Sequence, residues 1–120
     1  MTLGDTFWIE YLWVVLSDPT SDDEVVIVNL TSLRSNSDQT CLVHPGEHPH
    51  IDHDSVVMYN GARLVSRPTL ERMITNGTFQ AAPPVSQDLL RRIQQGALTS
   101  PFARPKIQVA VHNCLAKDDA

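Results

Sequence analysis

The sequence lacks any long hydrophobic run and contains little cysteine. Its longest nearly apolar segment, residues 7–16, is interrupted by Glu10, and ten residues are too few to span a bilayer. No lysine or arginine precedes Arg34, so we expect neither a signal peptide nor a transit peptide. The two cysteines, Cys41 and Cys114, have no metal-type spacing. These absences predict a cytoplasmic protein with reduced thiols and no membrane segment.

Basic residues are scarce in the first half of the chain. Residues 1–60 hold one basic and ten acidic side chains, whereas residues 61–120 hold eight basic and four acidic ones. The net charge of −5 argues against nonspecific nucleic-acid binding through a large basic face. Seven of the nine basic residues are arginines, which grip phosphate and carboxylate better than lysine does. A surface of both signs suits docking of a partner or of an identical subunit; alternatively, the charges only solvate the surface.

The composition nevertheless allows a real core. With 120 residues, 42% of them hydrophobic, we expect one folded domain over residues 1–120. Strand signals fill residues 4–66, where β-branched and aromatic residues dominate and turn residues separate the runs. Residues 25–31 form the clearest strand, and Asn60-Gly61 is the strongest hairpin signal because both residues tolerate positive φ. The predicted strands are residues 7–16 (one strand or two bent ones), 25–31, 40–43, 55–59, 62–65 and the alternating segment 106–112.

Two later segments carry helix signals. Pro68 suits a first helical turn, and apolar residues follow it at helical spacing until an Asn-Gly pair. Ser86 is a suitable N-cap for the second segment. We therefore predict helices over residues 68–76 and 86–96, and a frayed tail over residues 116–120. Short strands followed by two short helices indicate a mostly-β or α+β fold, built as a small, strongly bent antiparallel sheet or a half-open barrel.

Four of the five histidines are concentrated in residues 44–53, interleaved with carboxylates. Prolines and a glycine prevent a regular helix or central strand there, which predicts an ordered loop between two strands. Such ligands can hold a metal, although their order matches no strong metal signature. In a second interpretation, His48 or His53 shuttles a proton beside Asp52 or Asp54, because imidazole titrates near neutral pH. In a third, these side chains only cap turns and bind backbone groups.

A second polar group follows the clearest strand. Thr31 and Ser32 end that strand, and Arg34 lies in the next loop. A hydroxyl and a guanidinium at a strand end can hold a phosphate, the arginine through two parallel hydrogen bonds. The alternative is an ordinary turn with an exposed arginine. Trp8 and Trp13 indicate anchors of the core or of a dimer interface.

Five short segments of the chain are similar to segments of one protein family. They are GDTFWI at residues 4–9, WVVLS at 13–17, VVIVNLTS at 25–32, HDSVV at 53–57 and ARL at 62–64. The family that they resemble is the PemK/MazF-type toxins of toxin–antitoxin modules. The resemblance implies an SH3-like barrel that forms a homodimer, cleaves single-stranded RNA and is inhibited by an antitoxin. The hydroxyl at the family's strand end corresponds to Thr31, and its serine strand contains Ser55.

The chain departs from that family after its first strand. Residues 9–12 run directly into Trp13. Those toxins have a polar loop at this place, which supplies a catalytic residue, and an Arg-Pro pair after it; this chain has neither. Either the predicted loop with the four histidines of residues 44–53 replaces the missing group, or the barrel has lost the activity. In the first case we expect metal-independent cleavage of RNA by a general acid and a general base, with no cofactor. The predicted site residues are His48, His53 and Arg34 for catalysis, and Thr31 and Ser55 for substrate binding.

Two other functions stay open at this point. One is a non-catalytic SH3-like barrel that binds a protein partner through the strands of Trp8 and Trp13 or through the acidic first half. The other is a metal-dependent hydrolase that uses the histidines of residues 44–53. The expected partners are therefore a second copy of the chain, an RNA substrate, and an antitoxin or another protein.

Overall fold

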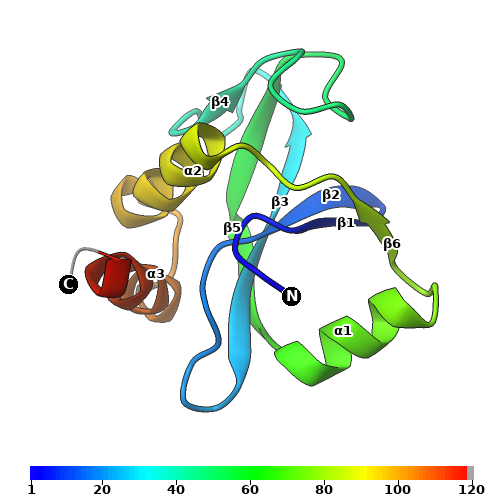
Figure 1. The fold of residues 1–120 in the computed structure, drawn as a ribbon. Helices are drawn as coiled ribbons and strands as arrows, with labels where there is room; N and C mark the ends of the chain where they lie inside the picture. Colours follow the sequence, from blue (N-terminus) through cyan, green and yellow to red (C-terminus); the bar gives the residue numbers. More distant parts are fainter. Residues whose placement is uncertain (119–120) are drawn as a thin grey trace.

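The computed structural model describes residues 1–118 and has an α+β fold (Figure 1). Six antiparallel strands form a half-barrel sheet in the order β4-β5-β3-β2-β1-β6, which confirms the small, strongly bent sheet. Three helices accompany the sheet, one more than predicted. The elements are β1 (Thr6–Ile9), β2 (Tyr11–Val15), β3 (Glu24–Ser32), β4 (Leu42–Val43), β5 (Ser55–Ser66), α1 (Arg67–Thr75), β6 (Gln80–Ala82), α2 (Gln87–Thr99) and α3 (Pro105–Asp118).

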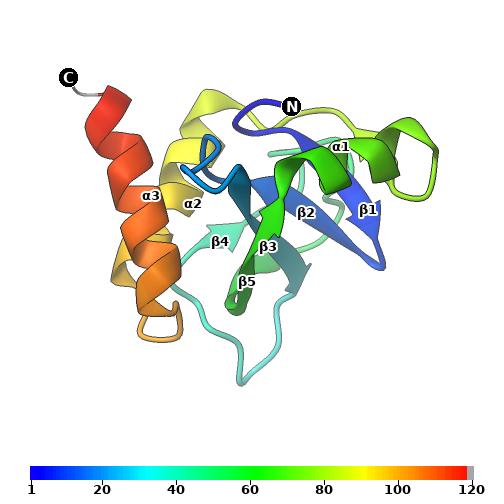
Figure 2. The same ribbon diagram turned by 90° about the horizontal axis from the view of Figure 1, so that it is seen from below.

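Strand β3 lies inside the sheet, as predicted for residues 25–31. Its side chains alternate between two hydrophobic clusters: Val26 and Val28 face the cluster that includes α2 and α3, whereas Val25 and Ile27 face the cluster that includes α1. Seen from below, α2 and α3 lie together on one side, with α1 on the other (Figure 2). Burial on both faces explains why this strand is a continuous apolar run rather than an alternating one.

The first apolar segment forms two strands joined at Glu10. That residue has a φ of 63° and reverses the chain, so that Ile9 pairs directly with Tyr11. The interpretation of residues 7–16 as two bent strands is therefore the one that the structure adopts. Strand β4 is shorter than the predicted residues 40–43. Strand β6 lies between the two predicted helices, where the sequence analysis predicted no strand.

The predicted hairpin at Asn60-Gly61 is wrong. Both residues lie within β5, which pairs with β3 on either side of them: residues 55–58 lie opposite residues 29–32, and residues 63–66 lie opposite residues 24–27. The pairing shifts register opposite these residues, and Gly61 has no positive φ. A Cβ at Gly61 would lie 3.0 Å from Asn29 Oδ1, so this glycine allows a close approach of two strands rather than a turn.

The predicted strand over residues 106–112 is also wrong, because α3 begins at Pro105 and includes that segment. Ile107 and Val111 are fully buried one turn apart, while Val109 is 58% exposed. The alternating letters therefore mark the two faces of a helix. Residues 116–118 continue this helix rather than fray, and residues 119–120 of the predicted tail lie outside the described part of the chain.

The two predicted helices are present and begin where their caps indicate. The Ser66 hydroxyl accepts the Thr69 N–H and precedes α1, and the Ser86 hydroxyl accepts the Leu89 N–H and precedes α2. Helix α2 continues to Thr99, beyond its predicted end at residue 96. No helix within residues 1–118 combines the length and apolar character needed to cross a membrane.

Candidate functional site

The histidine-rich segment between β4 and β5, residues 44–54, is an ordered loop, which we call the histidine loop. Backbone hydrogen bonds fold it back on itself: Gly46 N–H donates to Ile51 O, and Ile51 N–H donates to His48 O at 3.0 Å. Ile51 is only 8% exposed and belongs to the larger hydrophobic cluster. One apolar side chain therefore anchors a loop whose other side chains are mostly polar.

Glu47 fixes one end of the histidine loop to α2. Its carboxylate accepts hydrogen bonds from the Arg92 guanidinium and from the His44 N–H, the latter at 2.7 Å. Arg92 also donates to Leu42 O at 2.6 Å. The Arg92 hydrogen bond lowers the pKa of Glu47 below its ordinary value. The ionised carboxylate is therefore part of what holds the loop in place.

This linkage predicts a loss of stability in acid. Because the folded-state pKa of Glu47 is lowered, its contribution is present above the ordinary value of 4.5 and disappears as the pH falls below it. Glu47→Gln should cost about 0.5–1 kcal/mol of unfolding free energy at pH 7, and this difference should shrink as the pH falls below 4.5 and through the lowered pKa of Glu47. Chemical denaturation at pH 7 and at a pH below 4.5 checks this. The same substitution in an Arg92→Gln background should have no pH-dependent effect; an equal loss at both pH values would contradict the linkage.

His48 is held inside the loop rather than presented to a substrate. It is 3% exposed, its Nδ1 accepts the His50 N–H at 3.0 Å, and its Nε2 donates to Pro83 O at 2.6 Å. Both ring nitrogens therefore have partners, and the ring ties the loop to the segment before α2. The geometry gives His48 a structural position, separate from the other predicted site residues.

His53 lies in a different environment, between a carboxylate and a hydroxyl. Its Nδ1 is 2.5 Å from Asp52 Oδ1, and its Nε2 is 2.7 Å from Ser32 Oγ. A carboxylate only accepts, so Nδ1–H donates to Asp52 and Nε2 accepts the Ser32 hydroxyl proton. The hydrogen bond from His53 lowers the pKa of Asp52. The three side chains form a carboxylate–imidazole–hydroxyl relay, and the His53 side chain is 58% exposed.

The strand ends position this relay. Ser32, the last residue of β3, pairs with Ser55, the first residue of β5. Ser55 is 3% exposed, and its hydroxyl donates to His53 O at 3.0 Å. The Ser55 hydroxyl therefore supports the His53 backbone. Thr31 precedes Ser32 on β3 and is half-buried.

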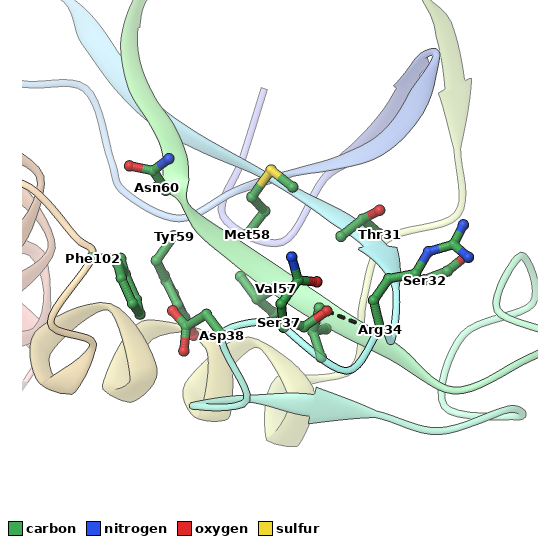
Figure 3. Close-up of a pocket in the computed structure, with 12 residues that line it drawn as sticks. Thr31, Ser32, Arg34, Ser37, Asp38, Val57, Met58, Tyr59, Asn60 and Phe102 are labelled. Atoms are coloured by element: carbon green, nitrogen blue, oxygen red, sulfur yellow. Dashed lines mark hydrogen bonds between the residues drawn. The ribbon is translucent and has the colours of Figure 1, made fainter.

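Two adjoining pockets meet at Thr31 and Ser32, which line both of them. The first, which we call the histidine pocket, has a volume of about 260 Å³ and is lined by Trp8, Glu10, Tyr11, Leu12, Leu30, Thr31, Ser32, His50, Ile51, His53 and Ser55. The second, which we call the Phe102 pocket, has a volume of about 310 Å³ and is shown in Figure 3. It is lined by Thr31, Ser32, Arg34, Asn36, Ser37, Asp38, Val56, Val57, Met58, Tyr59, Asn60 and Phe102.

Four of the five predicted site residues line these pockets. His53 and Ser55 line the histidine pocket, Arg34 lines the Phe102 pocket, and Thr31 lines both. In Figure 3 the Arg34 side chain extends toward the end of the pocket where Ser32 lies. His48 does not line either pocket. The structure thus places a relay, a strand-end hydroxyl and a guanidinium around two pockets that share Thr31 and Ser32.

The sequence analysis gave no separate role to His50, which also lines the histidine pocket. Its Nδ1 accepts the Trp8 indole N–H at 3.2 Å, so its Nε2 carries the ring proton in the neutral form. In the histidine pocket, His50 Nε2 is therefore a hydrogen-bond donor, whereas His53 Nε2 is an acceptor. The signal in the sequence was Trp8, because a partly buried indole N–H usually finds an acceptor.

The histidine loop disperses its side chains rather than gathering them on one point. Among the described residues, no three histidine, cysteine, aspartate or glutamate side chains are grouped so that they could hold a metal ion. Cys41 and Cys114 are both buried and form no disulfide. Burial raises the pKa of the Cys41 thiol.

Comparison with protein-family models, curated proteins and solved structures gives no match for this chain. The function is therefore inferred from the residues around the two pockets.

Proposed function

We propose that this protein is a metal-independent endoribonuclease that cleaves single-stranded RNA, as its resemblance to PemK/MazF-type toxins implies. The observation that carries the proposal is the Asp52–His53–Ser32 relay, which lies at a pocket that shares Thr31 and Ser32 with the pocket of Arg34. A base and a cation for phosphate are two of the groups that such a reaction uses.

The reaction would begin with His53. In RNA cleavage the 2′-hydroxyl attacks the adjacent phosphorus, and a general base removes the hydroxyl proton. His53 Nε2 already accepts a hydroxyl proton from Ser32, at 2.7 Å. The substrate 2′-hydroxyl would take the place of the Ser32 hydroxyl at this nitrogen. Asp52 would orient the ring and stabilise the imidazolium that forms.

The leaving oxygen needs a proton, which the His53 imidazolium can return after it has taken the 2′-hydroxyl proton. His50 Nδ1 accepts the Trp8 indole N–H, so its Nε2–H is the donor that can hydrogen-bond a phosphoryl oxygen. Arg34 would stabilise the negative charge that develops on the phosphoryl oxygens through paired hydrogen bonds. The products would be a 2′,3′-cyclic phosphate and a 5′-hydroxyl, and the proton that His53 takes from the 2′-oxygen ends on the 5′-oxygen.

The first test is cleavage by the wild-type protein. Purified protein with chelator present should cleave a single-stranded RNA and leave the DNA of the same sequence intact, because DNA has no 2′-hydroxyl. Gel analysis of end-labelled oligonucleotides measures both. Cleavage of RNA that disappears with chelator would favour the metal-dependent hydrolase. No cleavage of any RNA would end the nuclease proposal in favour of a barrel that binds a protein partner.

The relay also favours a second candidate, in which the Ser32 hydroxyl itself is the nucleophile. Ser32 Oγ lies 2.7 Å from His53 Nε2, the separation that activates a serine. Ser32→Ala separates the two: a serine nucleophile is lost with its hydroxyl, whereas in the ribonuclease the 2′-hydroxyl takes over and cleavage persists. The homodimer and the antitoxin partner stay predictions.

A further inference from the structure

We infer that the Phe102 pocket is a nucleobase subsite that holds an unpaired base next to the cleaved phosphate. This inference rests on the proposed function, because the proposed function makes RNA the ligand of the histidine pocket and of the adjoining Phe102 pocket. The pocket shares Thr31 and Ser32 with the histidine pocket, so a strand whose phosphate lies at Ser32 continues directly into it. Its volume of about 310 Å³ matches the lower end of small-ligand sites, which begin at about 300 Å³.

The pocket offers an aromatic ring that no residue of the core covers. Phe102 lies in the turn between α2 and α3 and is 55% exposed, and Met58 on β5 is 39% exposed. Both line the pocket, Phe102 at the opposite end from Arg34 (Figure 3). Exposed aromatic rings near cationic side chains are common stacking platforms for single-stranded nucleic acid.

Polar groups around this ring can read the edge of a base. Asn36 and Asn60 line the pocket and are both exposed, and each amide offers donors and an acceptor. Amides of this kind pair with the edges of unstacked bases. A duplex keeps those edges paired, which makes a single strand the ligand that the pocket fits.

The charges fix the direction in which a nucleotide would lie. Asp38 lines the pocket near Phe102, and Arg34 lies at the other end (Figure 3). Burial alone would raise the pKa of Asp38, but hydrogen bonds from Thr40 and Ser100 lower it, so the carboxylate stays ionised. An anionic phosphate is therefore favoured beside Arg34, and the uncharged base is favoured beside Phe102.

The walls of the pocket are held together before any ligand arrives. Ser100 is 2% exposed, its hydroxyl donates to Asp38 at 2.7 Å, and the same oxygen accepts the Phe102 N–H at 3.1 Å. In the loop between β3 and β4, the Arg34 N–H donates to Ser37 Oγ at 2.8 Å. A pocket that is formed in advance loses little freedom when it binds, which supports affinity.

The test measures binding of a short single-stranded RNA with a 2′-O-methyl group at every position, which cannot be cleaved through its 2′-oxygens. By fluorescence anisotropy, Phe102→Ala should weaken binding by about 5- to 150-fold, the loss expected for one stacked base. Phe102→Tyr should bind like wild type because it keeps the ring. Val109→Ala, which truncates another exposed apolar side chain outside the pocket, should also bind like wild type.

Binding and cleavage together separate this inference from the proposed function. Equal binding by wild type and Phe102→Ala, or no binding by wild type, would overturn the subsite even if natural RNA is cleaved. Phe102-dependent binding without cleavage of natural RNA would support the subsite and overturn the nuclease. Thermal melting of each variant should match wild type, because the Phe102 side chain is largely outside the core.

Discussion

His53→Ala is expected to lower kcat/KM for cleavage of single-stranded RNA by about 100- to 10,000-fold, the usual contribution of one general base. The folding cost should be about 0.5 kcal/mol or less, because the side chain is 58% exposed. Initial rates of cleavage and chemical denaturation of the same preparation measure the two effects.

Two other histidines of the same loop provide matched controls. His48→Ala should show the opposite pattern, a loss of about 1–3 kcal/mol in unfolding free energy. It leaves the His50 N–H without its acceptor and removes one of the two hydrogen bonds to Pro83 O, which also accepts the Thr6 hydroxyl. His44 is exposed and contacts Asp54 instead, so His44→Ala should change neither quantity much. Full activity in His53→Ala would contradict the assignment of the base.

The largest effect on stability is expected from Gly96→Ala. A Cβ at this position would lie 2.1 Å from Tyr59 Oη and 2.8 Å from its Cζ, far inside contact distance. The tyrosine cannot move away easily, because it is fully buried and its hydroxyl donates to Ile93 O at 2.8 Å. Overpacking should outweigh the helix propensity of alanine, leaving a net loss of about 3 kcal/mol.

A loss of this size should lower the melting temperature by about 10 °C or more. The matched control is Gln95→Ala in the same turn of α2, where the side chain is exposed and the effect should stay within about 0.5 kcal/mol. A more stable Gly96→Ala protein would contradict the packing of α2 on β5.

Local signals explain which parts of the fold could be predicted from the sequence. The caps Ser66 and Ser86 act within their own helices, and the apolar run of β3 requires burial on both faces wherever it lies. The errors came from signals that tertiary contacts override. Asn60-Gly61 can form a turn, but β5 pairs with β3 on both sides of these residues and continues through them. Alternating letters near Val109 fit two faces of a helix as well as two faces of a strand.

The candidate site shows the same division. The sequence indicated the histidine loop and the end of β3 as two separate polar groups, because each is continuous in the chain. Their contact joins Ser32 to His53 across 21 positions and depends on the pairing of β3 with β5. The hydrogen bonds that bury the His48 ring and place the His53 ring beside Ser32 likewise depend on the fold. Phe102 gave no signal at all, since an isolated phenylalanine usually indicates core.

The most direct test of the central claim is the mass of the products from a DNA oligonucleotide that contains a single ribonucleotide. If His53 activates a 2′-hydroxyl, wild-type protein should cut only after that ribonucleotide and leave a 2′,3′-cyclic phosphate on one fragment and a 5′-hydroxyl on the other. His53→Ala should leave the oligonucleotide intact over the same time. Cutting that leaves a 3′-hydroxyl and a 5′-phosphate, or cutting that survives in His53→Ala, would contradict the account.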